Sequence, residues 1–259
     1  MDLSFVKIFD VTFIKKEVEL LVFETYQKMS EKAADALIKL IKEKPNAIVS
    51  PASGNSPEGL YKNFVEKVKQ ENIDVSDLFF VGLDEWMEMN GSDEGSCRFY
   101  LNAQLFFPLK INEERIAFFD GRAQDPVAEC HRIDKAISEH NGIDLAIVGL
   151  GMNGHVGMNE PGTSPALHAH ISEIDPVTAA VGQKYFKEKT NLSSGITLGI
   201  ANLMEAKNIM LIVNGGKKAE ILKKVLEEEI SQELPASFLR NHSNFTVYAD
   251  AAAASLLNK

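Results

Sequence analysis

The sequence predicts an α/β protein with an open, mostly parallel, doubly wound sheet and helices on both faces. Short apolar runs alternate along the chain with helical patterns, which is the order of βα units. Three of these runs are followed at once by loops rich in glycine, serine or acids, as at the ligand-binding edge of such sheets. The 259 residues can bury a sizeable core, and no internal repeat or linker divides them, so we predict one domain over residues 1–259.

The elements can be assigned in order. Strands are predicted over residues 47–50, 79–86 and 143–148. Helical patterns are predicted over residues 17–41, from Glu58 through Val68, and over 217–230. The first of these helices has an apolar stripe formed by Leu20, Leu21, Phe23, Ala33, Leu37 and Ile41. Such stripes cover the sheet, so we assign these side chains to the core and not to a ligand-binding surface.

Composition excludes several classes of protein. The formal net charge of −10 disfavours nucleic acid as a partner and requires local donors for any anionic substrate. No signal sequence precedes the first predicted helix, and no apolar run reaches the length of a membrane span, so we expect a cytoplasmic protein without membrane contact. Cys97 and Cys130 are too few for a disulfide framework or a zinc site, and we expect reduced thiols.

A glycine-rich loop follows the strand at 143–148 and carries His155 and Glu160. Residues that leave the carboxyl end of such a strand line the crevice of an open α/β sheet. A histidine titrates near neutral pH, and a carboxylate can orient it or act beside it. The pairing indicates acid/base chemistry. A tight turn between strand and helix with an idle histidine is the alternative.

A second loop, residues 51–57, joins the strand at 47–50 to the next helix. Its backbone N–H groups and the Ser53 and Ser56 hydroxyls would favour an anion such as phosphate, and Pro57 suits the first helical turn. The loop is neither a Walker loop nor a dinucleotide fingerprint, because the residues that define those motifs are missing. An ordinary capped loop is the alternative.

The strand predicted at 79–86 ends in Asp84, Glu85 and Trp86. Asp84 is placed to act as a base or proton shuttle, while Glu85 points the other way because strand side chains alternate. Capping of the next helix or loop is the alternative, above all for Glu85.

These three segments, in this order, resemble the glucosamine-6-phosphate and galactosamine-6-phosphate isomerase (deaminase) family over nearly the whole chain. The resemblance implies an enzyme that needs neither metal nor cofactor. It implies catalytic roles for Asp84 as the base, His155 in sugar ring opening, and Glu160 as its partner. Asn153 stands where some members carry aspartate, which shifts support of His155 towards Glu160.

The resemblance also implies a phosphate site. Its residues would be Ser53, Gly54, Asn55, Ser56, Lys218 and Lys184. Lys184 occupies a position where glucosamine-6-phosphate deaminases typically have arginine, and a lysine lacks the bidentate fork, so a surface lysine is the alternative there. The expected partner is a phosphorylated aminosugar, and a homo-oligomer is left open.

The segments around Gly95-Ser-Cys97 and Pro235 to Phe245 look more like the galactosamine-6-phosphate isomerase branch. The expected reaction therefore converts galactosamine 6-phosphate to tagatose 6-phosphate and ammonia. The alternative substrate is glucosamine 6-phosphate, which would give fructose 6-phosphate. A 6-phosphogluconolactonase or a non-catalytic sugar-phosphate sensor agrees less well, since Asp84, His155 and Glu160 are all present.

Overall fold

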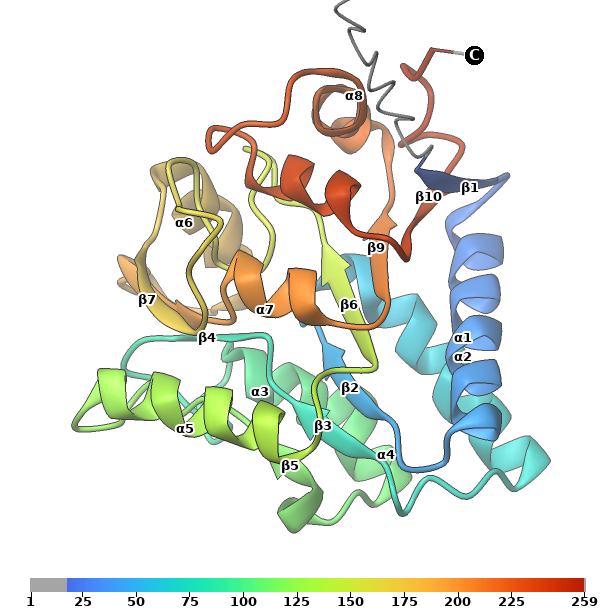
Figure 1. The fold of residues 1–259 in the computed structure, drawn as a ribbon, viewed down its shortest axis with the longest axis vertical. Helices are drawn as coiled ribbons and strands as arrows, with labels where there is room; N and C mark the ends of the chain where they lie inside the picture. Colours follow the sequence, from blue (N-terminus) through green and yellow to red (C-terminus); the bar gives the residue numbers. More distant parts are fainter. Residues whose placement is uncertain (1–17, 259) are drawn as a thin grey trace, which may run out of the picture.

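The computed structural model describes residues 18–258, and its central feature is a seven-stranded sheet in which every neighbouring pair is parallel (Figure 1). The strand order is β1-β10-β9-β6-β2-β3-β5. The strands are β1 (Glu19–Phe23), β2 (Ile48–Pro51), β3 (Phe79–Val81), β5 (Ile116–Ala117), β6 (Leu145–Gly149), β9 (Ile209–Val213) and β10 (Phe245–Asp250). The predicted fold class is confirmed.

Helices cover both faces of this sheet, because alternate strand residues point to opposite sides. Leu145 and Ile147 pack with α1 (Tyr26–Glu43), α2 (Asn55–Glu71) and the segment formed by α3 (Cys97–Leu101), the π-helix Asn102–Phe106 and α4 (Phe107–Leu109). Ala146 and Val148 belong to the core on the other face, together with residues of α5 (Pro126–Glu139), α7 (Ile200–Glu205) and α8 (Ala219–Glu227). Parallel strands that are buried on both faces have continuous apolar sequences, as β6 does.

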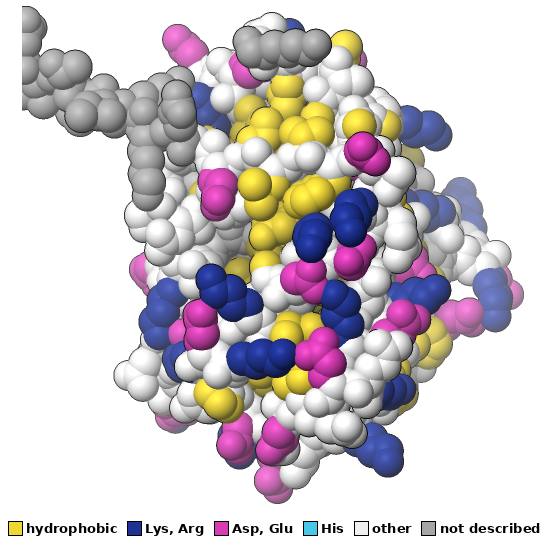
Figure 2. Space-filling view, turned by 90° about the vertical axis from the view of Figure 1, so that its right-hand side faces the viewer, with side chains coloured by type: hydrophobic (Ala, Val, Ile, Leu, Met, Phe, Trp, Pro, Cys, Tyr) yellow, Lys and Arg dark blue, Asp and Glu magenta, His cyan; other side chains and the backbone are white. Residues whose placement is uncertain are grey.

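Figure 2 shows the side of the molecule on which α1 and α2 lie, where basic and acidic side chains are interspersed around a band of hydrophobic ones. The acids and bases of α1 pair along the helix, as in Lys28–Glu31 and Lys32–Asp35. Such exposed pairs contribute little to stability. The stabilisation of α1 therefore comes mainly from its inner stripe, which includes Ala33, Leu37 and Ile41.

A second, smaller sheet was not predicted. It is antiparallel, in the order β4 (Asp84–Trp86), β8 (Ser194–Thr197) and β7 (His170–Glu173). The predicted strand at 79–86 is therefore two strands, because the chain leaves the large sheet after Val81. Gly82 allows this departure, since a Cβ there would lie 2.7 Å from the Phe118 ring. Asp84 then starts β4, which belongs to the second sheet.

The helix predicted over 17–41 is wrong at its start. Residues 19–23 form β1, which pairs with β10, and α1 begins only at Tyr26. The Thr25 hydroxyl accepts a hydrogen bond from the Lys28 N–H and so caps the helix. Leu20, Leu21 and Phe23, assigned above to the helical stripe, are strand residues.

Two other helix boundaries also differ. The helix expected from Glu58 begins at Asn55, after Gly54 with φ of 114°, and Pro57 lies in its first turn. The helix expected over 217–230 is a 3₁₀ turn at Gly216–Lys218 followed by α8, which ends at Glu227. The shift in α2 matters for function, because it places residues 53–56 at the amino end of the helix. None of the helices within residues 18–258 is both long and apolar enough to cross a membrane.

Buried Asp144 ties the amino ends of three strands together. Its carboxylate accepts hydrogen bonds from Lys44 (2.7 Å), Lys207 (2.7 Å) and the Ile48 N–H (2.8 Å). Burial would raise the pKa of Asp144, but the hydrogen bonds from the two lysines and Ile48 outweigh it and lower the pKa. A depressed carboxyl pKa stabilises the fold above the ordinary pKa, and this stabilisation is lost as the pH falls.

We predict that Asp144→Asn lowers the free energy of unfolding by about 2 kcal/mol at pH 7, because it leaves the lysines beside a neutral group. The difference from wild type should shrink towards pH 3. Urea denaturation measures both effects. Glu43→Gln is the control, since its exposed pair with Lys39 (3.9 Å) should be worth less than about 0.5 kcal/mol. Equal losses in the two variants would contradict the assignment.

Candidate active site

A cleft of about 190 Å³ opens at the carboxyl ends of the parallel strands. It lies between β2 and β6, where the direction of the strand order changes. From β2 the chain continues to β3 on one side, whereas the neighbour of β6 on the other side is β9. The residues expected from sequence that line it are Ser53, Gly54, Asn55, Ser56, Asp84, His155, Lys184 and Lys218. A larger hollow of about 750 Å³ lies at the amino ends of β9 and β10 beside α1 and contains none of them. The candidate catalytic and binding residues therefore identify the smaller cleft as the candidate active site.

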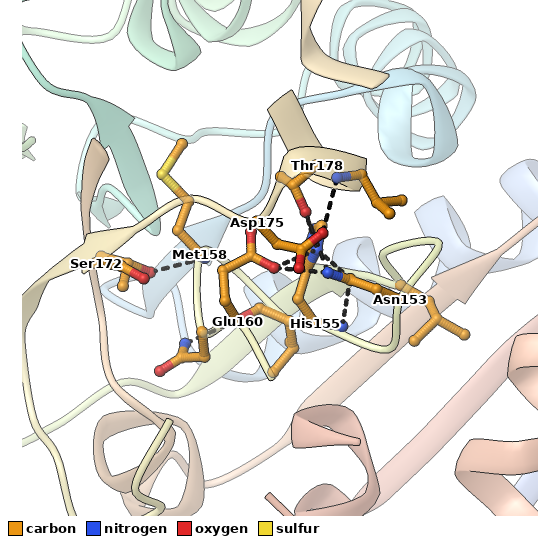
Figure 3. A network of polar contacts seen from close by, with 12 residues as sticks. Asn153, His155, Met158, Glu160, Ser172, Asp175 and Thr178 are labelled. Atoms are coloured by element: carbon orange, nitrogen blue, oxygen red, sulfur yellow. Dashed lines mark hydrogen bonds and ion pairs between the residues drawn. The ribbon is translucent and has the colours of Figure 1, made fainter. Parts of the chain in front are cut away.

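His155 is held by a polar network behind the cleft wall (Figure 3). Its Nδ1 lies 2.8 Å from Asn153 Oδ1, 2.9 Å from Thr178 Oγ1 and 3.5 Å from Glu160 Oε2. Asn153 and Glu160 do not line the cleft themselves but contact His155 from behind. Gly151 is required here, because a Cβ at that position would overlap the His155 ring.

The network determines which ring nitrogen of His155 carries the proton. The amide nitrogen of Asn153 donates to Glu160 Oε2 at 2.8 Å, since an ionised carboxylate can only accept. The Asn153 oxygen must then face His155 and accept from Nδ1–H. The neutral imidazole therefore keeps Nδ1 protonated, and Nε2 is left as the basic nitrogen for the cleft. The hydrogen bond to Glu160 thus fixes the orientation of the Asn153 amide, and this orientation fixes the tautomer of His155.

The pKa of Glu160 is consistent with this role. Burial would raise it, but hydrogen bonding and charge interaction with His155, and hydrogen bonds with Asn153 and Thr178, outweigh burial and lower the pKa. Glu160 is therefore an anion that orients its neighbours. Its Oε1 atom is buried and has no hydrogen-bond partner within residues 18–258.

Asp84 has the opposite perturbation. Only 9 % of the residue is exposed, and burial raises its pKa to about 6, although a hydrogen bond with Cys97 and the charge of His155 act against burial. A carboxylate with a pKa near the operating pH is suited to take up and return a proton. The surroundings of Asp84 and Glu160 therefore shift the pKa values of these two carboxyl groups in opposite directions.

Glu85 points away from the cleft, as the alternation of strand side chains predicts. Its carboxylate accepts from the backbone N–H groups of Trp86 (2.9 Å), Cys97 (2.9 Å) and Arg98 (3.0 Å). The last two begin α3, so Glu85 caps this helix, the alternative considered for it above. This contact holds Cys97, a buried free thiol like Cys130, against the cleft beside Asp84.

The other end of the cleft is suited to an anion. Gly54, the N-cap residue of α2, has no side chain with which to cap the helix, and Ser56 Oγ donates to Asn214 Oδ1 at 2.7 Å. Lys218 is half-buried and donates to the Leu150 carbonyl oxygen. Burial, and then the charge of Lys184, lower the Lys218 pKa to about 8. A bound anion would reverse this shift, because it would supply the missing counter-charge.

Lys184 lies on the 3₁₀ turn Gln183–Tyr185, and its side chain is exposed. Its Nζ is 4.8 Å from the centroid of the Tyr185 ring. Burial and the charge of Lys217 lower its pKa. Lys184 therefore lies with Lys218 at the positively charged end of the cleft. Its role in anion binding is a proposal.

Two site residues were missed by sequence reasoning. Thr178 lies on α6 (Pro176–Gly182), 23 residues after His155, and Tyr185 lies on the turn that follows. Neither belongs to a recognisable motif, and only the folding of α6 over the cleft brings them in. Within residues 18–258, no cluster of three or more His, Cys, Asp or Glu side chains could hold a metal ion.

Comparison with known proteins identifies the class. Residues 23–248 match the model of the glucosamine-6-phosphate isomerases/6-phosphogluconolactonase family, and the chain belongs to this family. The resemblance seen in the sequence is thus confirmed.

Particular relatives cover almost all of the chain. A glucosamine-6-phosphate deaminase of Geobacillus sp. (strain WCH70) is 36% identical over 93% of this chain and 96% of its own. The putative deaminase AgaI of Escherichia coli (strain K12) is 37% identical over 86% and 88%. A solved monomeric glucosamine-6-phosphate deaminase has a TM-score of 0.89 at 34% identity, covering 92% of this chain and 100% of that one. A 6-phosphogluconolactonase from Thermotoga maritima shares the fold, with a TM-score of 0.73 at 21% identity over 90% and 99%.

The raised pKa of Asp84 has a consequence for stability. An acid whose pKa is higher in the folded protein destabilises the fold once it is ionised, so the penalty grows between about pH 4 and pH 6 and is complete above. Asp84→Asn should therefore raise the free energy of unfolding by about 3 kcal/mol at pH 8 and hardly change it near pH 4. Urea denaturation at the two pH values tests this. A variant no more stable than wild type at pH 8 would rule out a desolvated Asp84.

Proposed function

We propose that this protein is a hexosamine 6-phosphate deaminase that converts an aminosugar 6-phosphate to a ketose 6-phosphate and ammonia. One observation carries the proposal. A buried carboxylate with a pKa of about 6, a histidine with an assigned basic nitrogen, and a lysine-lined anion site all face one cleft. The substrate has a matching set of groups: an acidic C2 proton in the open-chain form, a ring oxygen and a phosphate.

The proposed mechanism assigns one role to each group. His155 assists ring opening through Nε2, and Glu160 and Asn153 hold it in that orientation. Asp84, ionised above about pH 6, takes the C2 proton and returns it at C1. The resulting imine at C2 reacts with water, which gives the ketone and releases ammonia. The loop at 53–56 and Lys218 would hold the phosphate, so that the reacting carbons lie beside the base.

The choice between the two epimers stays a proposal. Names of the relatives favour glucosamine 6-phosphate, which is at least as well supported as the galactosamine isomer. Support for galactosamine 6-phosphate comes from the resemblance of segments such as Gly95-Ser-Cys97 to the galactosamine branch, and Gly95 and Cys97 line the cleft. We keep galactosamine 6-phosphate as the predicted substrate and glucosamine 6-phosphate as the alternative.

A coupled assay of ammonia release from both epimers tests the function and the substrate separately. We expect turnover without added metal and a higher kcat/KM for galactosamine 6-phosphate. A preference for glucosamine 6-phosphate would select the alternative and leave the mechanism unchanged. If neither epimer releases ammonia, the deaminase proposal fails, and lactone hydrolysis becomes the next reaction to measure.

The phosphate site can be tested with neighbouring lysines. Lys218→Ala should raise the KM for substrate, and the inhibition constant of inorganic phosphate, by about tenfold or more, because a charge-assisted contact is lost. The kcat should change far less. Lys217→Ala is the matched control, since Lys217 is exposed and lines no part of the cleft. Lys184→Ala should have a similar or smaller effect than Lys218→Ala. Unchanged phosphate inhibition in Lys218→Ala would remove this lysine from the site.

A further inference from the structure

A continuous helical segment, residues 176–185, contacts both ends of the cleft. It consists of α6 and the 3₁₀ turn Gln183–Tyr185, which follows α6 without a break, and we call it the arm. Asp175 caps its start by accepting from the Val177 N–H at 2.7 Å. A helical segment moves as a unit more readily than it bends, so the two ends of the arm are mechanically connected.

At one end, Thr178 completes the network around His155 (Figure 3). Its Oγ1 lies 2.9 Å from His155 Nδ1 and 3.4 Å from Asn153 Nδ2. Thr178 is buried, and its hydrogen bond to Glu160 contributes to the low pKa of that acid. It is the contact through which the arm reaches the acid/base group.

At the other end, Tyr185 contacts the loop at residues 53–56, which we call the phosphate loop. Its hydroxyl accepts from the Asn55 N–H, the first in α2, at 3.3 Å. That N–H is one of the donors that an anion at this helix end would use. Burial raises the pKa of Tyr185 to about 12, so the phenol stays neutral. The next residue back, Lys184, adds a positive charge at the same place.

The arm is held at several points along its length. Gly182 lies against the Trp86 ring, and a Cβ there would be 3.0 Å from it. The Tyr100 hydroxyl donates to the Tyr185 carbonyl oxygen at 3.1 Å. Val181, which is 39% exposed, lines the cleft between the two ends. The middle of the arm therefore faces the cleft as well.

We propose that Thr178 is a positioning residue through which anion binding at the phosphate loop, sensed by Tyr185 and Lys184, sets the orientation of His155. An anion that takes the Asn55 N–H must displace the Tyr185 hydroxyl, and the arm carries this displacement to Thr178. The inference rests on the anion site of the proposed function. It explains how a phosphate remote from the reacting carbons could raise kcat as well as affinity.

The test uses inorganic phosphate as the probe and needs no turnover. The ring resonances of His155, assigned with His155→Gln, are followed by NMR during phosphate titration, while calorimetry measures phosphate affinity. In wild type and Thr178→Ser we expect a clear response of Nδ1. In Thr178→Val, which keeps the shape and lacks the hydroxyl, the response should fall by at least half, with phosphate affinity within about twofold of wild type.

Kinetics provide a second readout. Thr178→Val should lower kcat about tenfold with little change in KM, and Thr178→Ser should restore most of it. Tyr185→Phe should weaken the His155 response, and adding it to Thr178→Val should cause no further loss, because both act through one route.

The outcomes separate the two proposals. Phosphate binding with an undiminished His155 response in Thr178→Val would overturn the role of the arm and leave the proposed function standing. Independent, multiplicative effects of Thr178→Val and Tyr185→Phe on kcat would overturn it as well. Absence of phosphate binding to the wild-type protein would overturn both the arm and the anion site.

Discussion

The parallel pairing of β2 with β6 is the constraint on which the site depends. Ser50 lies opposite Ala146 and Pro51 opposite Ile147, and the Ala52 N–H continues the ladder to the Ile147 carbonyl oxygen at 3.0 Å. The loops that follow the two strands therefore start side by side and then diverge, one into α2 and the other into the turn that carries His155. A change of register by one residue would turn the buried side chains to the opposite face and separate the loops.

Within that cleft, burial acts differently on each ionisable group, according to the partners that the fold provides. Glu160 is buried among donors and stays ionised, whereas Asp84 is buried with few and has a raised pKa. Lys218 pairs with no acid among residues 18–258, and burial lowers its pKa. An anionic substrate would supply the missing partner in a protein whose net charge of −10 otherwise repels it. The unpaired charge of Lys218 is therefore unfavourable in the free protein and would be neutralised by a bound anion.

Features with a local signal could be predicted from the sequence. Apolar runs with glycine-rich or acidic endings predicted the parallel sheet, and the motifs around Ser53, Asp84 and His155 predicted residues that the structure brings to one cleft. Features that depend on a distant partner could not be predicted. Leu20 and Leu21 fit a helical stripe, and only pairing with β10 makes them strand residues. Likewise, an apolar run from 79 to 86 cannot reveal that its last three residues pair with β8 in another sheet.

The fold class, the family and the candidate catalytic residues could therefore be predicted from the sequence alone, because these predictions depend on periodicity and on short motifs. Tertiary structure decided how those residues act. The tautomer of His155 follows from the order Glu160, Asn153, His155 in space, and the contact with Thr178 follows from the placement of α6 over the cleft. Hydrogen-bond direction and burial are properties of the assembled site, and no spacing along the chain encodes them.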